Sequence, residues 1–196
     1  MAKKPPLIVL TFPITKELFG MIDRAVRKAG YTAAIEWSEN ISPPANADQF
    51  AGEAIYVICN SGMANRVAVP IYERCMRALR RGQSTTLVFG HPGKAAAIDE
   101  IWKRRRSLFR KHKETKDLIA FCGTLPWIGS VTKFHLAKNL GADVAKPDVH
   151  LVRLAVSNRE TAQGLCERLA METGYRAATI DLILWRACAD GIIHSR

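Results

Sequence analysis

Acidic residues are scarce in this chain of 196 residues, which holds 18 Asp and Glu against 29 Lys and Arg. The formal net charge is therefore +11 at pH 7. Such an excess favours polyanions, because binding releases their counterions, but basic proteins also bind membranes and acidic partners. Charge alone thus favours nucleic acid as the partner without deciding between these classes.

Long apolar runs are also missing. No run is long enough to span a bilayer, so we expect no membrane partner. The start of the chain, Met1–Pro6, is followed by a short apolar stretch, Leu7–Leu10. A secretory signal peptide needs a longer apolar region and a cleavage site of small residues. The sequence therefore favours a cytoplasmic, nucleoid-associated location.

Paired cysteines are absent. The chain has 5 cysteines, an odd number, and no Cys-x-x-Cys pair occurs among them. This pattern argues against a zinc site and against a disulfide framework, so we expect no metal. The simplest expectation is that all of them are small core residues, namely Cys59, Cys75, Cys122, Cys166 and Cys188.

Helical patterns account for most of the chain, which predicts an all-α protein. Thr15 is placed to cap the first helix, and Gly30 follows the end of that helix. Residues 7–12 read as a short strand or an extended arm. The expected helices cover residues 16–28, about 48–59, about 64–80, 94–109, 117–122, 131–140, 149–155, 160–173 and 179–189.

Two motifs stand out in the second half of the chain. Leu125-Pro126-Trp127-Ile128-Gly129 forms a tight hairpin between two short helices, and Lys146-Pro147-Asp148-Val149-His150-Leu151 follows after one helix and a loop. In this order and at this separation they resemble the helix-hairpin-helix DNA glycosylase superfamily. Its marks are a Leu-Pro-Gly-(Ile/Val)-Gly hairpin and a downstream Asp in a (Val/Pro)-Asp-x-His context.

The resemblance implies an all-α, two-lobed fold with the active-site cleft between the lobes. A six-helix lobe would span residues 51–145, and residues 1–50 together with 146–196 would form the other lobe. Some members carry a C-terminal iron–sulfur loop of four cysteines. Only Cys166 and Cys188 lie beyond Asp148, so we expect a protein without that cluster, without another cofactor, and monomeric.

The resemblance makes Asp148 the catalytic carboxylate. Cleavage of an N-glycosidic bond builds positive charge on the sugar, and a carboxylate stabilises that charge and orients water. An Asp after a proline is also a common helix N-cap, and both roles are compatible. His150 stands where the family places a phosphate contact. A structural hydrogen bond on the first turn of a helix is the alternative role for His150.

The hairpin would bind a DNA phosphate through backbone amides, with Leu125, Trp127, Gly129 and Val131 against the DNA. A following helix adds its positive N-terminal end to such a surface. Trp127 departs from the family, which has glycine there. If that position needs a positive φ, tryptophan is costly. An ordinary Pro-Trp turn is the alternative.

A lysine decides the subclass. Members that also cut the strand carry a nucleophilic lysine two residues after the second hairpin glycine, where this chain has Val131. Lys133 lies two positions further, roughly 200° around a helix. The sequence therefore favours a monofunctional enzyme that uses water. A bifunctional glycosylase and lyase acting through Lys133 is the alternative.

Further DNA contacts are expected from three places. Asn60 and Ser61 stand in a segment that approaches DNA in the family, although they could instead cap the next helix. Lys94 supplies a cation at a helix start. Arg104 and Arg105 belong to a basic run over residues 103–116, whose alternative role is a solvated helix face.

The sequence thus predicts a base-excision glycosylase that hydrolyses a damaged or modified base from double-stranded DNA. A helix-hairpin-helix module that binds DNA without chemistry is the main rival from another class, and a binder of polyanions other than DNA is a third. The motifs do not identify the base.

Overall fold

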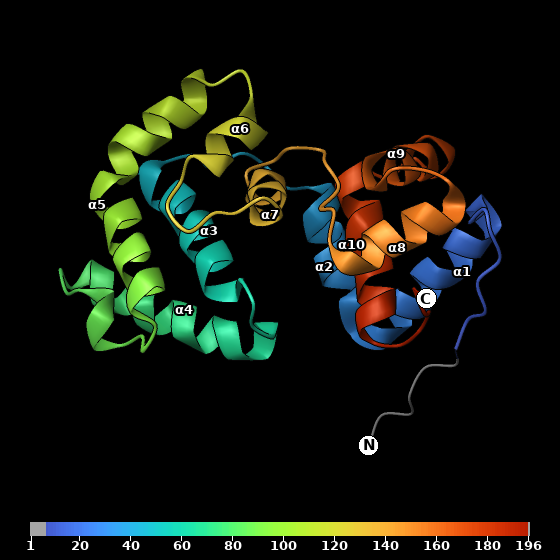
Figure 1. Cartoon of the computed structure of the whole chain (residues 1–196), viewed down its shortest axis with the longest axis horizontal. Helices are drawn as coiled ribbons and strands as arrows, with labels where there is room; N and C mark the ends of the chain where they lie inside the picture. Colours follow the sequence, from blue (N-terminus) through green and yellow to red (C-terminus); the bar gives the residue numbers. More distant parts are fainter. Residues whose placement is uncertain (1–6, 196) are drawn as a thin grey trace. The chain divides into compact units, whose positions relative to one another are not determined.

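Every regular element of the computed structural model, which describes residues 7–195, is a helix (Figure 1). The prediction of an all-α protein is therefore confirmed for this part of the chain. The start, Met1–Pro6, on which the expectation of no signal peptide partly rests, lies outside it. The helices are α1 Lys16–Val26, η1 Arg27–Tyr31, α2 Thr32–Glu39, α3 Ala47–Asn60, α4 Asn65–Arg80, η2 Thr85–Leu87, α5 Pro92–Glu114, α6 Leu118–Gly123, α7 Thr132–Asn139, α8 Val149–Asn158, α9 Ala162–Thr173 and α10 Ala177–Ala189.

The helix boundaries follow local chemistry that the sequence already carries. Thr15 caps α1, because its hydroxyl accepts the Leu18 N–H at 3.3 Å. Gly30 has φ 98° and interrupts the helical path, as its position in the sequence predicted. The chain does not leave the helix there for a loop, however. The pattern missed α2, which resumes directly after Gly30 and has few buried residues to mark it.

The chain forms two compact units. One unit joins the N-terminal part of the chain, through Ile41, to the part from Asp143 onward, and the other is Ser42–Ala142. The lobes expected from the resemblance were 1–50 with 146–196, and 51–145.

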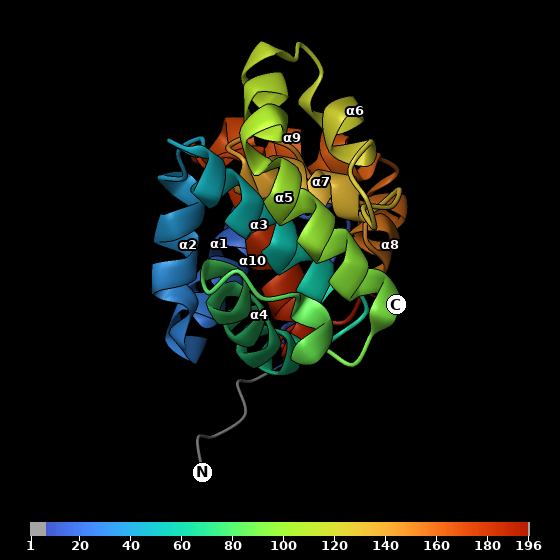
Figure 2. The ribbon, with the colours of Figure 1, turned by 90° about the vertical axis from the view of Figure 1, so that its left-hand side faces the viewer.

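In the unit Ser42–Ala142, α3 is the central helix. It packs against α4, α5 and α7, while α6 packs against α7. Figure 2 looks onto α5, which crosses in front of α3. Phe50 of α3 is fully buried and lies in an aromatic cluster with Phe109, His112 and Phe121. Burial lowers the pKa of His112 in this cluster.

In the other unit, α10 takes the central place. It packs against α1, α2, α8 and α9, and its buried face includes Ile180, Ile183 and Leu184. Asp143, at the start of the segment that leads to Asp148, accepts the Ala178 N–H of α10 at 2.8 Å. The Lys146 N–H donates to the carboxylate of Asp181 in α10 at 2.9 Å. These bonds fasten the segment before Asp148 to the central helix.

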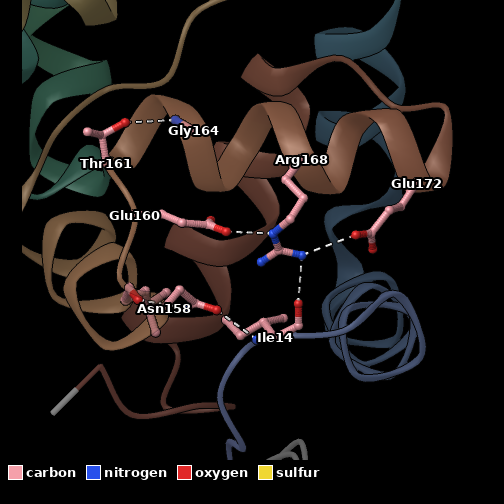
Figure 3. Close-up of polar contacts among 8 residues, drawn as sticks. Ile14, Asn158, Glu160, Thr161, Gly164, Arg168 and Glu172 are labelled. Atoms are coloured by element: carbon pink, nitrogen blue, oxygen red, sulfur yellow. Dashed lines mark hydrogen bonds and ion pairs between the residues drawn. The ribbon is translucent and has the colours of Figure 1, made fainter.

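The N-terminal arm is tied to this same unit by polar contacts (Figure 3). The Ile14 N–H donates to Asn158 Oδ1 at 2.7 Å, and the Ile14 carbonyl accepts a hydrogen bond from Arg168 at 3.1 Å. Arg168 also pairs with Glu160 and Glu172. Before them, the Ile8 N–H donates to the Ile192 carbonyl at 2.7 Å. Residues 7–12 form no regular strand, so of the two expected forms the structure has the arm.

No helix within residues 7–195 combines the length and the apolar character needed to cross a membrane. Four of the cysteines, Cys59, Cys75, Cys122 and Cys166, are buried as expected, whereas Cys188 is half-buried.

Candidate functional site

The hairpin is a tight turn between α6 and α7. The Ile128 N–H donates to the Leu125 carbonyl at 3.2 Å, which closes a four-residue turn with Pro126 and Trp127 at its centre. Trp127 has φ 65°. Proline followed by a positive φ is the pattern of a type II turn, which favours glycine at the position of Trp127. This position therefore does need the left-handed conformation, and tryptophan adopts it at a cost.

Packing of its ring explains how Trp127 is accommodated. The ring lies against the N-terminal end of α5, edge-on to His91 at 5.1 Å between centroids. A Cβ added to Gly93 would come within 2.5 Å of a Trp127 ring carbon, so only glycine leaves room for this contact. The Trp127 ring thus connects the turn to the N-terminal end of α5. The contact gives tryptophan a structural role at a position where the turn favours glycine.

Only the first of the backbone N–H groups from Gly129 to Thr132 donates a hydrogen bond within the described residues. The Gly129 N–H, expected to face a phosphate, donates to the Thr132 hydroxyl at 2.7 Å. The next three amides, those of Ser130, Val131 and Thr132, donate no hydrogen bond within the described part of the chain. They lie at the start of α7, where the helix dipole is positive. The N–H groups without an acceptor in the described residues therefore lie one to three residues beyond Gly129.

The other hairpin residues differ in exposure. Leu125 is 4 % exposed and belongs to the core, whereas Val131 is 37 % exposed. The stem of Lys133 lies beside Gly123, where its Cδ would be 3.5 Å from an added Cβ, and its Nζ lies 5.3 Å from the Phe134 ring centre. Lys133 thus packs along α6 and its own helix.

A cavity of about 690 Å³ opens beside the hairpin within the same unit. It brings together three residues that the sequence selected, Ser61, Lys94 and Trp127, and others that it did not select as DNA contacts. Its lining consists of Ser61, Gly62, Met63, Ile71, Arg74, Val88, Phe89, Gly90, His91, Lys94 and Trp127. Arg74 was missed because a lone arginine on an amphipathic helix has no distinguishing pattern.

Lys94 is the least expected member of this cavity. Only 5 % of its surface is exposed, and its ammonium donates to the Ser61 carbonyl at 2.5 Å. Burial lowers the pKa of Lys94 from its ordinary value of 10.5. No carboxylate forms an ion pair with it within residues 7–195. The sequence predicted a cation at a helix start, and in the structure this cation lies in the first turn of α5 and is buried.

Asn60 and Ser61 end α3 and do not cap α4. The Ser61 hydroxyl donates to the Ile58 carbonyl at 2.9 Å, and Asn60 Nδ2 lies 3.3 Å from the Tyr56 hydroxyl. The N-cap of α4 is Ala64, which has no capping side chain. The alternative role of a helix cap for Asn60 and Ser61 is therefore wrong.

Asp148 caps α8 in the other unit. Its Oδ1 accepts the His150 and Leu151 N–H groups at 3.0 and 3.1 Å. Its Oδ2 lies 3.9 Å from Lys146 Nζ, and 14 % of the side chain is exposed. One carboxylate oxygen therefore fixes the rotamer, and the other keeps only a long ion pair.

His150 is held by the C-terminal tail. Its Nδ1 lies 3.0 Å from the hydroxyl of Ser195, which is 7 % exposed. Cys188 is hydrogen-bonded to the same hydroxyl, and burial is the main cause that raises the pKa of the Cys188 thiol to about 11. The structural hydrogen bond predicted as the alternative role of His150 is thus present. It occupies Nδ1 alone and leaves the other ring nitrogen for a further partner.

Arg104 and Arg105 are both engaged within the protein. Arg104 pairs with Glu100, and Arg105 pairs with Asp48 while its guanidinium lies 4.2 Å from the Trp102 ring centre. Their neighbour Arg106 is exposed and forms no ion pair in the described part of the chain. The basic run therefore mixes paired and unpaired cations.

Metal ligands do not gather in the described residues, where no group of three or more His, Cys, Asp or Glu side chains could hold an ion. No family model matches the chain, and searches of curated proteins and of solved structures likewise gave no match.

Proposed function

We propose that this protein is a monofunctional DNA glycosylase that hydrolyses the bond between a modified base and its deoxyribose in double-stranded DNA. The observation that carries the proposal is the way in which the Asp148 carboxylate is held. Its rotamer is fixed by two backbone N–H bonds to one oxygen, while the other oxygen has only Lys146 at 3.9 Å. The proposal includes the two-lobed helix-hairpin-helix fold that the motifs resemble, a monomer, and a nucleoid-associated location.

The proposed reaction needs a carboxylate held in place before charge develops. The bond between C1′ and the base nitrogen breaks, the base leaves with the electron pair, and positive charge grows on the sugar. Preorganised charge stabilises such a transition state because it need not be reoriented during the reaction. Asp148 Oδ2 faces the cation in this scheme and orients the water whose oxygen then bonds to C1′. The proton that this water loses balances the one that the departing base takes up.

The hairpin supports the same proposal by its free amides. Ser130, Val131 and Thr132 offer three consecutive N–H groups at the N-terminal end of α7. Such an array binds a phosphate oxygen without reading sequence. His150 supplies the second phosphate contact, through the ring nitrogen that Ser195 does not occupy.

The packing of Lys133 favours water over an amine as the nucleophile. Its stem lies beside Gly123 and its ammonium near the Phe134 ring, both within its own unit. The bifunctional alternative requires this amine to leave that position and attack the sugar. A reaction through Lys133 would form an imine, which borohydride reduces to a stable adduct.

A panel of duplexes, each with one modified base, tests the function. Free base and strand breaks are scored separately, with and without borohydride. We expect free base from at least one duplex, abasic product that breaks only after alkali, and no adduct. An adduct that forms at the rate of base release, and that is lost in Lys133→Gln, would replace the monofunctional assignment by the bifunctional one. Tight binding with no base released from any duplex would favour a DNA-binding module without chemistry.

A further inference from the structure

Folding alone does not explain the buried charge of Lys94. A buried ammonium is costly unless it is paired and hydrogen-bonded. Within residues 7–195, Lys94 has one carbonyl partner, at 2.5 Å, and no carboxylate. The ammonium has three N–H donors, so one carbonyl leaves it incompletely satisfied.

The rest of the cavity adds positive charge and no negative charge. Arg74 lines it with Lys94, and no Asp or Glu is among the lining residues. Arg74 is exposed and forms no ion pair within residues 7–195. The cavity also opens at the N-terminal end of α5, where the helix dipole is positive and the first turn holds no acidic residue.

Gly93, in the first turn of α5, is not among the lining residues, and the Lys94 N–H donates to His91 Nδ1 at 3.3 Å. The cavity therefore offers two cationic side chains at a helix N-terminus, which are groups that bind phosphate oxygens. The volume of about 690 Å³ is ample for such a group.

We propose that this cavity binds a phosphate group, held by Lys94 and Arg74, and that the bound anion is the counter-charge which Lys94 lacks. The inference deepens the proposed function and rests on it for the assignment of the phosphate to a DNA strand. Trp127 joins the cavity to the hairpin, so a phosphate here would lie in the same unit as the free amides of α7. The phosphate could otherwise be a free anion, and the chemistry of recognition would be the same.

Calorimetric titration of the full chain with inorganic phosphate, at constant ionic strength with chloride, tests the cavity. Lys94→Met removes the buried charge, and Lys16→Met is the matched control, because Lys16 is an exposed lysine in the first turn of another helix, α1. We expect phosphate binding in the wild type and in Lys16→Met. In Lys94→Met we expect it to be weaker by about tenfold or more, as for the loss of one charged hydrogen bond.

Arg74→Met is the second variant, since Arg74 is exposed and its loss leaves the core intact. Arg74→Met should also weaken phosphate binding. It therefore tests the cavity in the case that Lys94→Met does not fold. No phosphate binding by the wild type, or equal binding by the wild type, Lys94→Met and Arg74→Met, would overturn the inference.

A competition arm identifies the source of the phosphate. If undamaged duplex displaces inorganic phosphate from the wild type, the phosphate belongs to a DNA strand. If both bind together, the cavity takes a free phosphate. Neither arm measures base release, so a protein that binds phosphate through Lys94 and releases no base keeps this inference and loses the proposed function.

Discussion

The N-terminal ends of α8 and α5 differ in the sign of their charge. At α8 the capping residue is Asp148, whose carboxylate accepts two backbone N–H bonds and complements the positive end of the helix. At α5 the cap is His91, and the first turn holds Lys94, a buried cation at a positive helix end. The carboxylate of Asp148 stabilises α8, whereas the buried ammonium of Lys94 at the start of α5 is unfavourable for folding.

This difference separates two kinds of functional evidence. Asp148 combines a capping role with the proposed catalytic role, so a substitution that removes its charge and keeps the cap separates the two. Lys94 gains its only observed partner, the Ser61 carbonyl, at the C-cap of α3. That bond offsets part of the cost of burial, but it supplies no negative counter-charge. A residue that folding does not favour points to a ligand more directly than one that folding favours.

The largest effect is expected from Asp148→Ala, which removes both roles at α8. Loss of an N-cap lowers the free energy of unfolding by about 1 kcal/mol, and base release should fall by roughly two or more orders of magnitude. Denaturant unfolding and single-turnover base release measure the two effects. Asp117→Ala is the control, because Asp117 caps α6 by accepting the Ala120 N–H at 2.9 Å. It should lower stability and leave base release nearly unchanged.

Gly93→Ala tests the contact between α5 and the hairpin. The new methyl group would lie 2.5 Å from the Trp127 ring, so the ring must move. We expect the free energy of unfolding to fall by about 1–3 kcal/mol, as for overpacking. Gly90→Ala should have little effect, since nothing lies within 4 Å of a Cβ there. If adding Trp127→Gly to Gly93→Ala does not recover stability, the ring contact is not the cause.

Lys94 should make stability depend on pH in a defined direction. Burial lowers the folded-state pKa below 10.5, so the unfolded chain binds more protons between the two values. The free energy of unfolding of the wild type, relative to Lys94→Met, should therefore rise from neutral pH toward pH 10.5. Denaturant unfolding at several pH values, in phosphate-free buffer, measures this difference. A flat difference would mean that Lys94 carries no penalty for its charge.

The smallest effect concerns the basic run on α5. Replacing Arg104, Arg105 and Arg106 by Ala should lower the slope of log K against log salt for duplex binding by about 0.9 for each DNA phosphate that the variant no longer neutralises. Since Arg104 and Arg105 are already paired with acids, Arg106→Ala alone should account for most of the change. An unchanged slope in the triple variant would identify the run as a solvated face.

The sequence predicted what depends on local chemistry. Caps, helix-stopping glycines and apolar spacing located most helices, and Thr15 and Asp148 cap as expected. It missed α2, because that helix follows Gly30 without a loop. The need for a positive φ at Trp127 was foreseen as a conditional cost, and the ring contact that compensates for it was not.

Tertiary contacts were beyond the reach of the sequence pattern. The sequence placed Lys94 at a helix start but did not predict its burial. Its burial depends on the end of α3, 33 positions away in the chain. The pairing of Arg105 with Asp48 and of His150 with Ser195 likewise joins residues that no local pattern connects.

Asp148→Asn separates capping from catalysis and tests the central claim most directly. Asparagine caps a helix about as well as aspartate, so stability should be kept while the negative charge is lost. We predict unchanged unfolding, nearly unchanged duplex binding, and base release slower by roughly two or more orders of magnitude, because the charge acts on the transition state. A variant that releases base at the wild-type rate, or that loses binding and turnover equally, would contradict a catalytic role for Asp148.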